Sequence, residues 1–329
     1  MEDFKKLFDS FLSLKVGVVG DVMLDTYMWG NVDRISPEAP VPVVTLQSKE
    51  YRIGGAGNVA LNCRSLGASV SILSVTGDDS EGIILSELFE SNNIDTSYLI
   101  KSAARKTTSK TRIISRNQQM LRMDAEVTDD LNISDENLLL KRVQDYIAVA
   151  DPDVIIFEDY NKGVLTERVI HKIIIVCNAA GIITAVDPKR KSFFSYKGVN
   201  IFKPNMKEVK DALNLLFEEP TQTLLQSIHT GIRNNLQHQI SLITLSDKGI
   251  FYQQDNIASI VPSHLRNIAD VSGAGDTVIA VASLVYAASK NAHLMAEVAN
   301  IAGGLVCEEV GTVAINKERL LQECELLLS

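Results

Sequence analysis

A carboxylate beside a turn of three small residues is the part of the sequence best suited to chemistry. Gly273, Ala274 and Gly275 precede Asp276, and an apolar, alanine-rich run over 278–288 is long enough for three turns of buried helix. Backbone N–H groups in such a turn can point at one anion, and a helix beginning there adds the positive end of its dipole. A carboxylate beside an anion site makes sense if it holds the proton of an attacking hydroxyl. The pattern therefore indicates phosphoryl transfer; the alternative is a strand-to-helix turn in which Asp276 only stabilises the first helical turn.

Polar residues also follow several expected buried strands, at the sheet edge where ligands collect in parallel α/β folds. They are Asp21 and Asp25, Asp159, Asp187, Lys203 with Asn205, and Asp276. One acidic strand end is common as a helix cap. Five such ends, together with two glycine-rich turns, favour a site for a polyol and a phosphate.

Two of these positions face the acceptor side of the expected site. Asp25 lies beyond its strand, where it can bind sugar hydroxyls or stabilise a turn. Gly54 and Gly55 let the backbone approach a ligand, with Asn58 able to bond a hydroxyl, although close helix–strand packing explains the glycines equally well.

Asn205 and Glu208 are three residues apart at an expected helix start, so they share one face. Because Mg²⁺ prefers oxygen ligands and keeps its waters, the pair can hold hydrated Mg²⁺, or it can be an ordinary capping pair.

Cations gather in the stretch 107–124 and follow two further strand ends. They are Lys110, Arg112, Arg116 and Arg122, then Lys162 and Lys189. A solvated strand face is the usual explanation for such charges. In a chain of negative net charge, however, a local basic cluster can also hold an anionic substrate.

Composition limits the classes of partner. The chain has 329 residues, 46% of them hydrophobic, and a net charge of −9, which argues against nucleic acid or an anionic membrane. Its four cysteines show no metal or disulfide spacing and predict reduced thiols in a cytoplasmic protein. The N-terminus lacks the layout of a signal peptide, and no apolar run is long enough for a membrane span.

Strands alternating with helices predict a mostly parallel sheet covered on both faces. Ser134 is expected to cap a helix that runs to about Ala150. The proline-rich and alternating segments 27–52 and 98–125 interrupt the rhythm and predict a small separate sheet.

Together these features resemble the ribokinase-like (PfkB) sugar kinases over essentially the whole chain. The runs that carry the resemblance are 20–25, 34–43, 54–60, 115–119, 187–189 and 270–277. Two of them, RISPEAPVPVV from Arg34 and SRNQQ from Ser115, more specifically resemble the heptose 7-phosphate branch of the family.

The resemblance implies one domain over 1–329, a three-layer α/β/α sandwich with a small β-sheet lid through which a homodimer forms. It makes Asp276 the base and Gly273, Ala274 and Gly275 the anion hole. The implied substrate-binding residues are Asp21, Asp25, Gly54, Gly55, Asn58, Arg112, Arg116, Asp159, Lys162 and Lys189. The implied nucleotide-binding residues are Asn205, Glu208, Thr244, Ser246, Gly249 and Asn300, with Asn205 and Glu208 organising Mg²⁺ through water.

The implied reaction is ATP-dependent phosphorylation of the C1 hydroxyl of D-glycero-D-manno-heptose 7-phosphate, a step toward ADP-heptose and lipopolysaccharide. The alternatives are a PfkB kinase for another sugar and a non-catalytic sugar- or nucleotide-binding regulator. Whether a monovalent cation is also needed is left open. Two departures stand out: Ser246 occupies a position where many family members have glycine, and the chain has no His-x-Gly-His motif, so adenylylation is expected in a separate protein.

Overall fold

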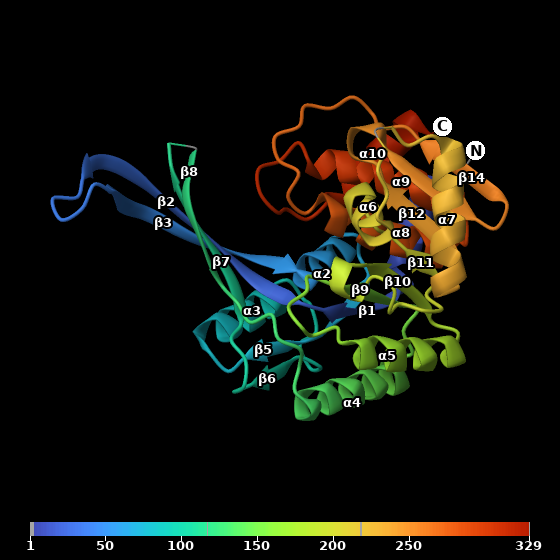
Figure 1. The fold of residues 1–329 in the computed structure, drawn as a ribbon, viewed down its shortest axis with the longest axis horizontal. Coiled ribbons are helices and arrows are strands. Elements are labelled where there is room, and N and C mark those ends of the chain that lie inside the picture. The colour runs from blue at the N-terminus through green and yellow to red at the C-terminus, as the bar shows by residue number, and fades with distance from the viewer. Residues whose placement is uncertain (1–2, 117, 218, 329) are drawn as a thin grey trace.

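The computed structural model describes residues 3–116, 118–217 and 219–328, so Asn117 of the SRNQQ run lies outside the described residues. Within these ranges an eight-stranded sheet runs through the body of the molecule (Figure 1). Its spatial order is β14 (Ile257–Val261), β13 (Ile250–Gln254), β12 (Ile240–Thr244), β11 (Ile201–Phe202), β10 (Ile183–Asp187), β9 (Val154–Glu158), β1 (Lys15–Gly20) and β4 (Ser69–Leu73). The neighbours from β12 to β4 pair in parallel, and only β13 and β14 join in antiparallel fashion. The predicted mostly parallel sheet is confirmed.

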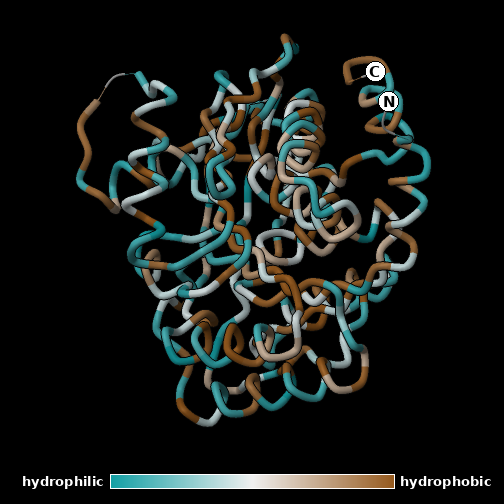
Figure 2. Tube along the Cα trace, turned by 90° about the vertical axis from the view of Figure 1, so that its right-hand side faces the viewer, coloured by the Kyte–Doolittle hydropathy of each residue, from teal (hydrophilic) through white to brown (hydrophobic). Residues whose placement is uncertain are grey.

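Both faces of this sheet are covered, because successive side chains of a strand point to opposite faces. In β9, Val154 and Ile156 enter one hydrophobic cluster, whereas Ile155 and Phe157 enter the other. The first cluster is completed by α1 (Phe4–Ser10), η1 (Phe11–Ser13), α2 (Ala56–Ser65), α3 (Ser80–Ser91), α8 (Ala274–Ser289), α9 (Ala292–Val306) and α10 (Lys317–Leu327). The second is completed by α4 (Ile133–Ala150), α5 (Glu167–Ala180), α6 (Met206–Leu213) and α7 (Gln222–Leu236). Figure 2 shows hydrophobic segments running through the interior of this three-layer sandwich.

A second sheet projects from the body and forms a lid (Figure 1). This lid sheet has the order β3 (Pro42–Gly55), β2 (Val22–Ile35), β7 (Thr108–Ser115) and β8 (Gln118–Ala125). The segment expected at 98–125 is therefore divided, because β6 (Ile100–Ser102) pairs with β5 (Val75–Gly77) instead. The first lid strand also begins earlier than expected, since β2 continues from β1 with one residue between them.

Helix starts follow side-chain caps. The Thr166 and Thr221 side chains cap α5 and α7. The prediction that Ser134 caps α4 is wrong: the Asn132 side chain accepts the N–H of Asp135, so the helix begins at Ile133. The four cysteines are buried and unbonded, and none of the described helices combines the length and hydropathy needed to cross a membrane.

Candidate active site

Asp276 lies in the first turn of α8 and is 3% exposed. Its Oδ2 accepts a hydrogen bond of 2.7 Å from Nδ2 of Asn58, and its Oδ1 accepts one of 2.7 Å from the hydroxyl of Tyr160. Burial raises the pKa of Asp276 to about 6, and the two hydrogen bonds limit the rise because they favour the ionised form. A carboxylate with a pKa this close to neutrality is suited to accept a proton from a hydroxyl.

The turn before Asp276 requires glycine. Gly273 caps α8 with φ +80°, and a Cβ there would lie 2.8 Å from Nδ2 of Asn58. Asn58 itself is held by Asn62, whose Nδ2 donates to the Asn58 carbonyl at 2.8 Å while its Oδ1 accepts from Thr277 at 3.1 Å. The contact between α2 and α8 thus fixes Asn58, which donates to the carboxylate of Asp276. The first N–H groups of α8 have no carbonyl of their own helix to bond, which suits them to an anion.

The expected acceptor-side residues come together where the lid sheet joins the body. Oδ1 of Asp25, a residue 3% exposed, accepts a hydrogen bond of 2.7 Å from Arg112. A Cβ at Gly54 would lie 2.6 Å from Oδ2 of Asp25, so the missing side chain makes room for this carboxylate. Gly55 has φ +60° and caps α2, which carries Asn58 one turn later.

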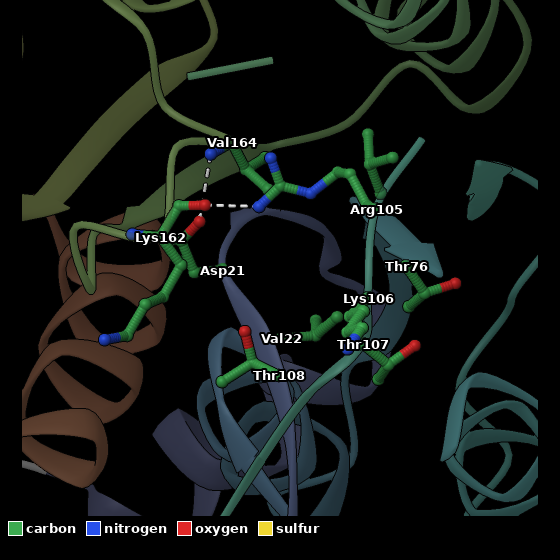
Figure 3. A pocket seen from close by; sticks show the side chains of 10 residues that line it. Asp21, Val22, Thr76, Arg105, Lys106, Thr107, Thr108, Lys162 and Val164 are labelled. Carbon is green, nitrogen blue, oxygen red and sulfur yellow. Dashed lines mark hydrogen bonds between the residues drawn. The ribbon is translucent and has the colours of Figure 1, made fainter. Parts of the chain in front are cut away.

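Asp21 stabilises the loop that follows β9, at residues 160–164. Its Oδ2 accepts from the N–H groups of Tyr160 (2.9 Å) and Lys162 (3.0 Å), and its Oδ1 accepts from that of Val164 (3.0 Å). These bonds position Tyr160 and engage both oxygens of Asp21, and the binding of a sugar by Asp21 stays a prediction. The adjoining cavity, shown in Figure 3, has a volume of about 10 Å³, room for one water at most. Arg105 closes one side of it and donates to the Lys162 carbonyl (Figure 3).

Two other expected substrate residues, Asp159 and Lys162, have partners that occupy their polar groups. Asp159 accepts from the N–H of Asn161 at 2.8 Å and from the hydroxyl of Tyr196 at 2.9 Å, and burial raises its pKa to about 6. Nζ of Lys162 pairs with Glu126 at 2.7 Å.

Arg116 is not brought to the other site residues. Its side chain is 78% exposed and lies 3.9 Å from a carboxylate oxygen of Asp33. Along the lid hairpin it lies four positions after Arg112, which does reach the site.

A buried ionic cluster lies next to the α8 turn. Asp187 bonds Nζ of Lys203 at 2.7 Å and Nζ of Lys189 at 3.1 Å, and Lys189 also pairs with Glu208 at 2.9 Å. Glu158 is fully buried, and in the described part of the chain neither of its carboxylate oxygens has a hydrogen-bond partner. Burial raises the pKa of Glu158 well above the usual value. One oxygen each of Glu158, Asp187 and Asp276 lie within 4.8 Å of one another. Because Lys189 and Lys203 occupy both oxygens of Asp187, these lysines neutralise the cluster.

The Asn205–Glu208 pair forms a complete capping box at the start of α6. Oδ1 of Asn205 accepts the N–H of Glu208 at 2.9 Å, and Oε2 of Glu208 accepts the N–H of Asn205 at 2.8 Å. The capping alternative therefore describes the contacts in the structure. It does not displace the magnesium expectation, because each oxygen keeps a second lone pair for a metal-bound water and oxygen donors fit Mg²⁺.

The expected nucleotide residues lie around the end of β12 and on α9. Thr244 forms a β-bridge with Asn205. Ser246 adopts φ +60°, a conformation that glycine adopts without strain, and a Cβ at Gly249 would overlap the Val261 carbonyl. Asn300 donates to the Pro262 carbonyl at 2.8 Å, so its amide holds the following loop.

Sequence reasoning missed Tyr160 and Glu158 as parts of the environment of Asp276, whereas Lys203 was already among the expected strand-end residues. Glu158 is the last residue of β9, at the sheet edge where Asp276 lies, so the strand-end rule could have placed it there. Tyr160 carries no such signal, because its role depends on the loop that Asp21 holds.

The sequence profile described as "pfkB family carbohydrate kinase" matches residues 13–319. The chain belongs to the PfkB family of carbohydrate kinases. Similar curated proteins include "Bifunctional protein HldE" of Aliarcobacter butzleri (strain RM4018), 37% identical over 93% of this chain and 63% of that protein. The HldE protein of Methylobacillus flagellatus (strain ATCC 51484 / DSM 6875 / VKM B-1610 / KT) is 41% identical over 94% of this chain and 62% of its own length. This PfkB chain thus spans somewhat less than two thirds of these relatives.

Solved structures show the same fold. Phosphofructokinase-2 from Escherichia coli in complex with potassium superposes with a TM-score of 0.79 at 17% identity, covering 96% of this chain and 99% of that one. Arabidopsis thaliana ribokinase complexed with ribose and ATP gives 0.70 at 15% identity, covering 94% and 98%. The ribokinase-like fold is confirmed, and the family to which the chain belongs is one of carbohydrate kinases.

Proposed function

We propose that this PfkB kinase transfers the γ-phosphoryl group of ATP to the C1 hydroxyl of D-glycero-D-manno-heptose 7-phosphate, giving the 1,7-bisphosphate. The observation that carries the proposal is the buried carboxylate of Asp276, held between Asn58 and Tyr160 at the start of α8. In the reaction the C1 oxygen attacks phosphorus, the bond from phosphorus to the β,γ-bridging oxygen breaks, and Asp276 takes the hydroxyl proton.

The remaining groups position the reactants and stabilise charge. Asp25 is the carboxylate on the lid side that can accept bonds from sugar hydroxyls. Backbone N–H groups at 273–275 stabilise the transferring phosphoryl group, and Lys189 and Lys203 lie beside that turn. When bound through water at Asn205 and Glu208, Mg²⁺ would neutralise charge on the triphosphate.

Two observations support the choice of a heptose phosphate. The RISPEAPVPVV and SRNQQ runs, which resemble the heptose branch, lie in or beside the lid strands that carry Asp25 and Arg112. The site also carries several cations in a chain of net charge −9, which suits an anionic acceptor.

We also infer a homodimer formed through the lid sheet. Large apolar side chains on its strands and their connection are between 41% and 61% exposed, namely Ile35, Val41, Leu46, Met120, Leu121 and Met123. Such a group is more often covered by a partner than left in water.

A coupled assay of ADP release across a sugar panel tests the function. The panel is heptose 7-phosphate, the same heptose without phosphate, fructose 6-phosphate and ribose. We expect heptose 7-phosphate to have the highest kcat/KM. A higher kcat/KM for another sugar of the panel would identify that sugar as the substrate in place of heptose 7-phosphate. Absence of turnover with every sugar would favour a non-catalytic regulator.

A further inference from the structure

The cations around the acceptor side differ in whether a carboxylate already neutralises them. Arg112 bonds Asp25, Lys162 bonds Glu126, and Lys189 bonds both Asp187 and Glu208. Each of these side chains would have to share or break an ion pair in order to bind a phosphate. Lys110 is different: within the described ranges, no carboxylate oxygen lies within 4.0 Å of its Nζ.

The register of the lid sheet explains why none of the described carboxylates pairs with Lys110. This register places Lys110 of β7 opposite Asp25 of β2 on one side and Asp124 of β8 on the other. Both carboxylates are taken by arginines: Arg112 bonds Asp25 at 2.7 Å, and Arg122 bonds the two oxygens of Asp124 at 2.9 and 3.0 Å. Lys110 is partly buried, and this burial lowers its pKa because the ammonium loses water. A partly desolvated cation without a counter-ion gains more binding free energy from an anionic ligand than a cation that is already in an ion pair.

Tyr160 relates Lys110 to the catalytic base. Nζ of Lys110 lies 5.6 Å from the centroid of the Tyr160 ring, while the hydroxyl of that ring donates to Asp276 at 2.7 Å. One tyrosine side chain therefore separates the cation from the carboxylate. A sugar with its reacting hydroxyl at Asp276 would extend its far end along this ring toward Lys110.

We propose that Lys110 binds the terminal phosphate of the acceptor and so selects a sugar phosphomonoester over the free sugar. The inference rests on the proposed kinase function. A phosphate dianion at this place supplies the counter-charge that Asp25 and Asp124 do not, and the paired arginines keep those carboxylates from repelling it.

The test compares Lys110→Gln with wild type, using heptose 7-phosphate and the unphosphorylated heptose as acceptors. Losing a charged hydrogen bond should raise KM for heptose 7-phosphate about 10- to 100-fold, with KM for the free heptose and for ATP changed less than about twofold. Lys110→Arg should restore most of the affinity. Lys101→Gln, which removes an exposed lysine from β6, is the matched control and should leave both KM values unchanged.

Each other outcome overturns the inference. An equal rise in KM for both sugars would mean that Lys110 acts on the sugar or the fold, and a rise in KM for ATP alone would place it on the donor phosphates. These results leave the kinase function standing, since turnover is still measured. Absence of turnover by wild type with every acceptor would instead refute the proposed function itself.

Discussion

Replacing Tyr160 by phenylalanine should move the pH dependence of catalysis to higher pH. Asp276 must be ionised to accept a proton, so activity falls as the pH drops through its pKa of about 6. The Tyr160 hydroxyl stabilises the ionised form through a bond of 2.7 Å. A hydrogen bond to a charged group is worth about 1.5–3 kcal/mol, and one pKa unit corresponds to about 1.4 kcal/mol. The acid limb of the pH–rate profile should therefore shift to higher pH by about one to two units.

The assay is kcat/KM for the sugar from pH 5 to 9, measured by coupled ADP release. At pH values above the displaced limb, Tyr160→Phe should regain most of the wild-type rate, because the variant keeps the ring and the carboxylate. Tyr196→Phe is the matched control: it removes a hydroxyl that bonds a different buried carboxylate, Asp159. An acid limb that stays in place, or moves to lower pH, in Tyr160→Phe would refute the reasoning.

Two further predictions concern packing and stability. Gly54→Ala puts a Cβ 2.6 Å from Oδ2 of Asp25, so KM for the sugar should rise about tenfold or more. Gly231→Ala is the control, because a Cβ there meets nothing within 4 Å and KM should not change. Equal KM values in the two variants would contradict the role of Asp25. Burial lowers the pKa of His229 to about 4 and that of His238 to about 3, so only the unfolded chain binds these protons as the pH falls below about 6.5. Stability should therefore fall with pH, by on the order of 2 kcal/mol per histidine at pH 5. Urea unfolding midpoints at pH 7 and 5 measure this loss of stability. The double variant His229→Gln/His238→Gln should lose less stability than wild type between these pH values. Equal losses would contradict the assignment of the pH dependence to the two buried histidines.

Much of the architecture could be predicted because its signals are local. The run Val154–Phe157 is apolar at every position, as a strand buried on both faces must be, and it becomes β9. The small residues before Asp276 predict a tight turn into a helix, and Gly273 has the positive φ that such a turn uses. Asn205 and Glu208 form the capping pair that their spacing offered as the alternative to a magnesium site.

The contacts that decide chemistry depend on tertiary structure and had no local signal. Asp21 looks like a ligand-binding strand-end carboxylate, but three N–H groups from the loop after β9 occupy its oxygens. Arg116 is in the same basic stretch as Arg112, yet it lies at the exposed end of the lid hairpin. Lys110 stands out only when the ion pairs of its neighbours are known.

The most direct test of the central claim is single-turnover phosphoryl transfer by Asp276→Asn, measured together with ATP affinity. The amide keeps the size of the side chain but cannot hold the proton, so we expect the rate to fall by about 10²- to 10⁴-fold while the Kd for ATP stays within about twofold. A variant that keeps most of its rate with heptose 7-phosphate would show that another group takes the proton and that the buried carboxylate at the start of α8 is not the base.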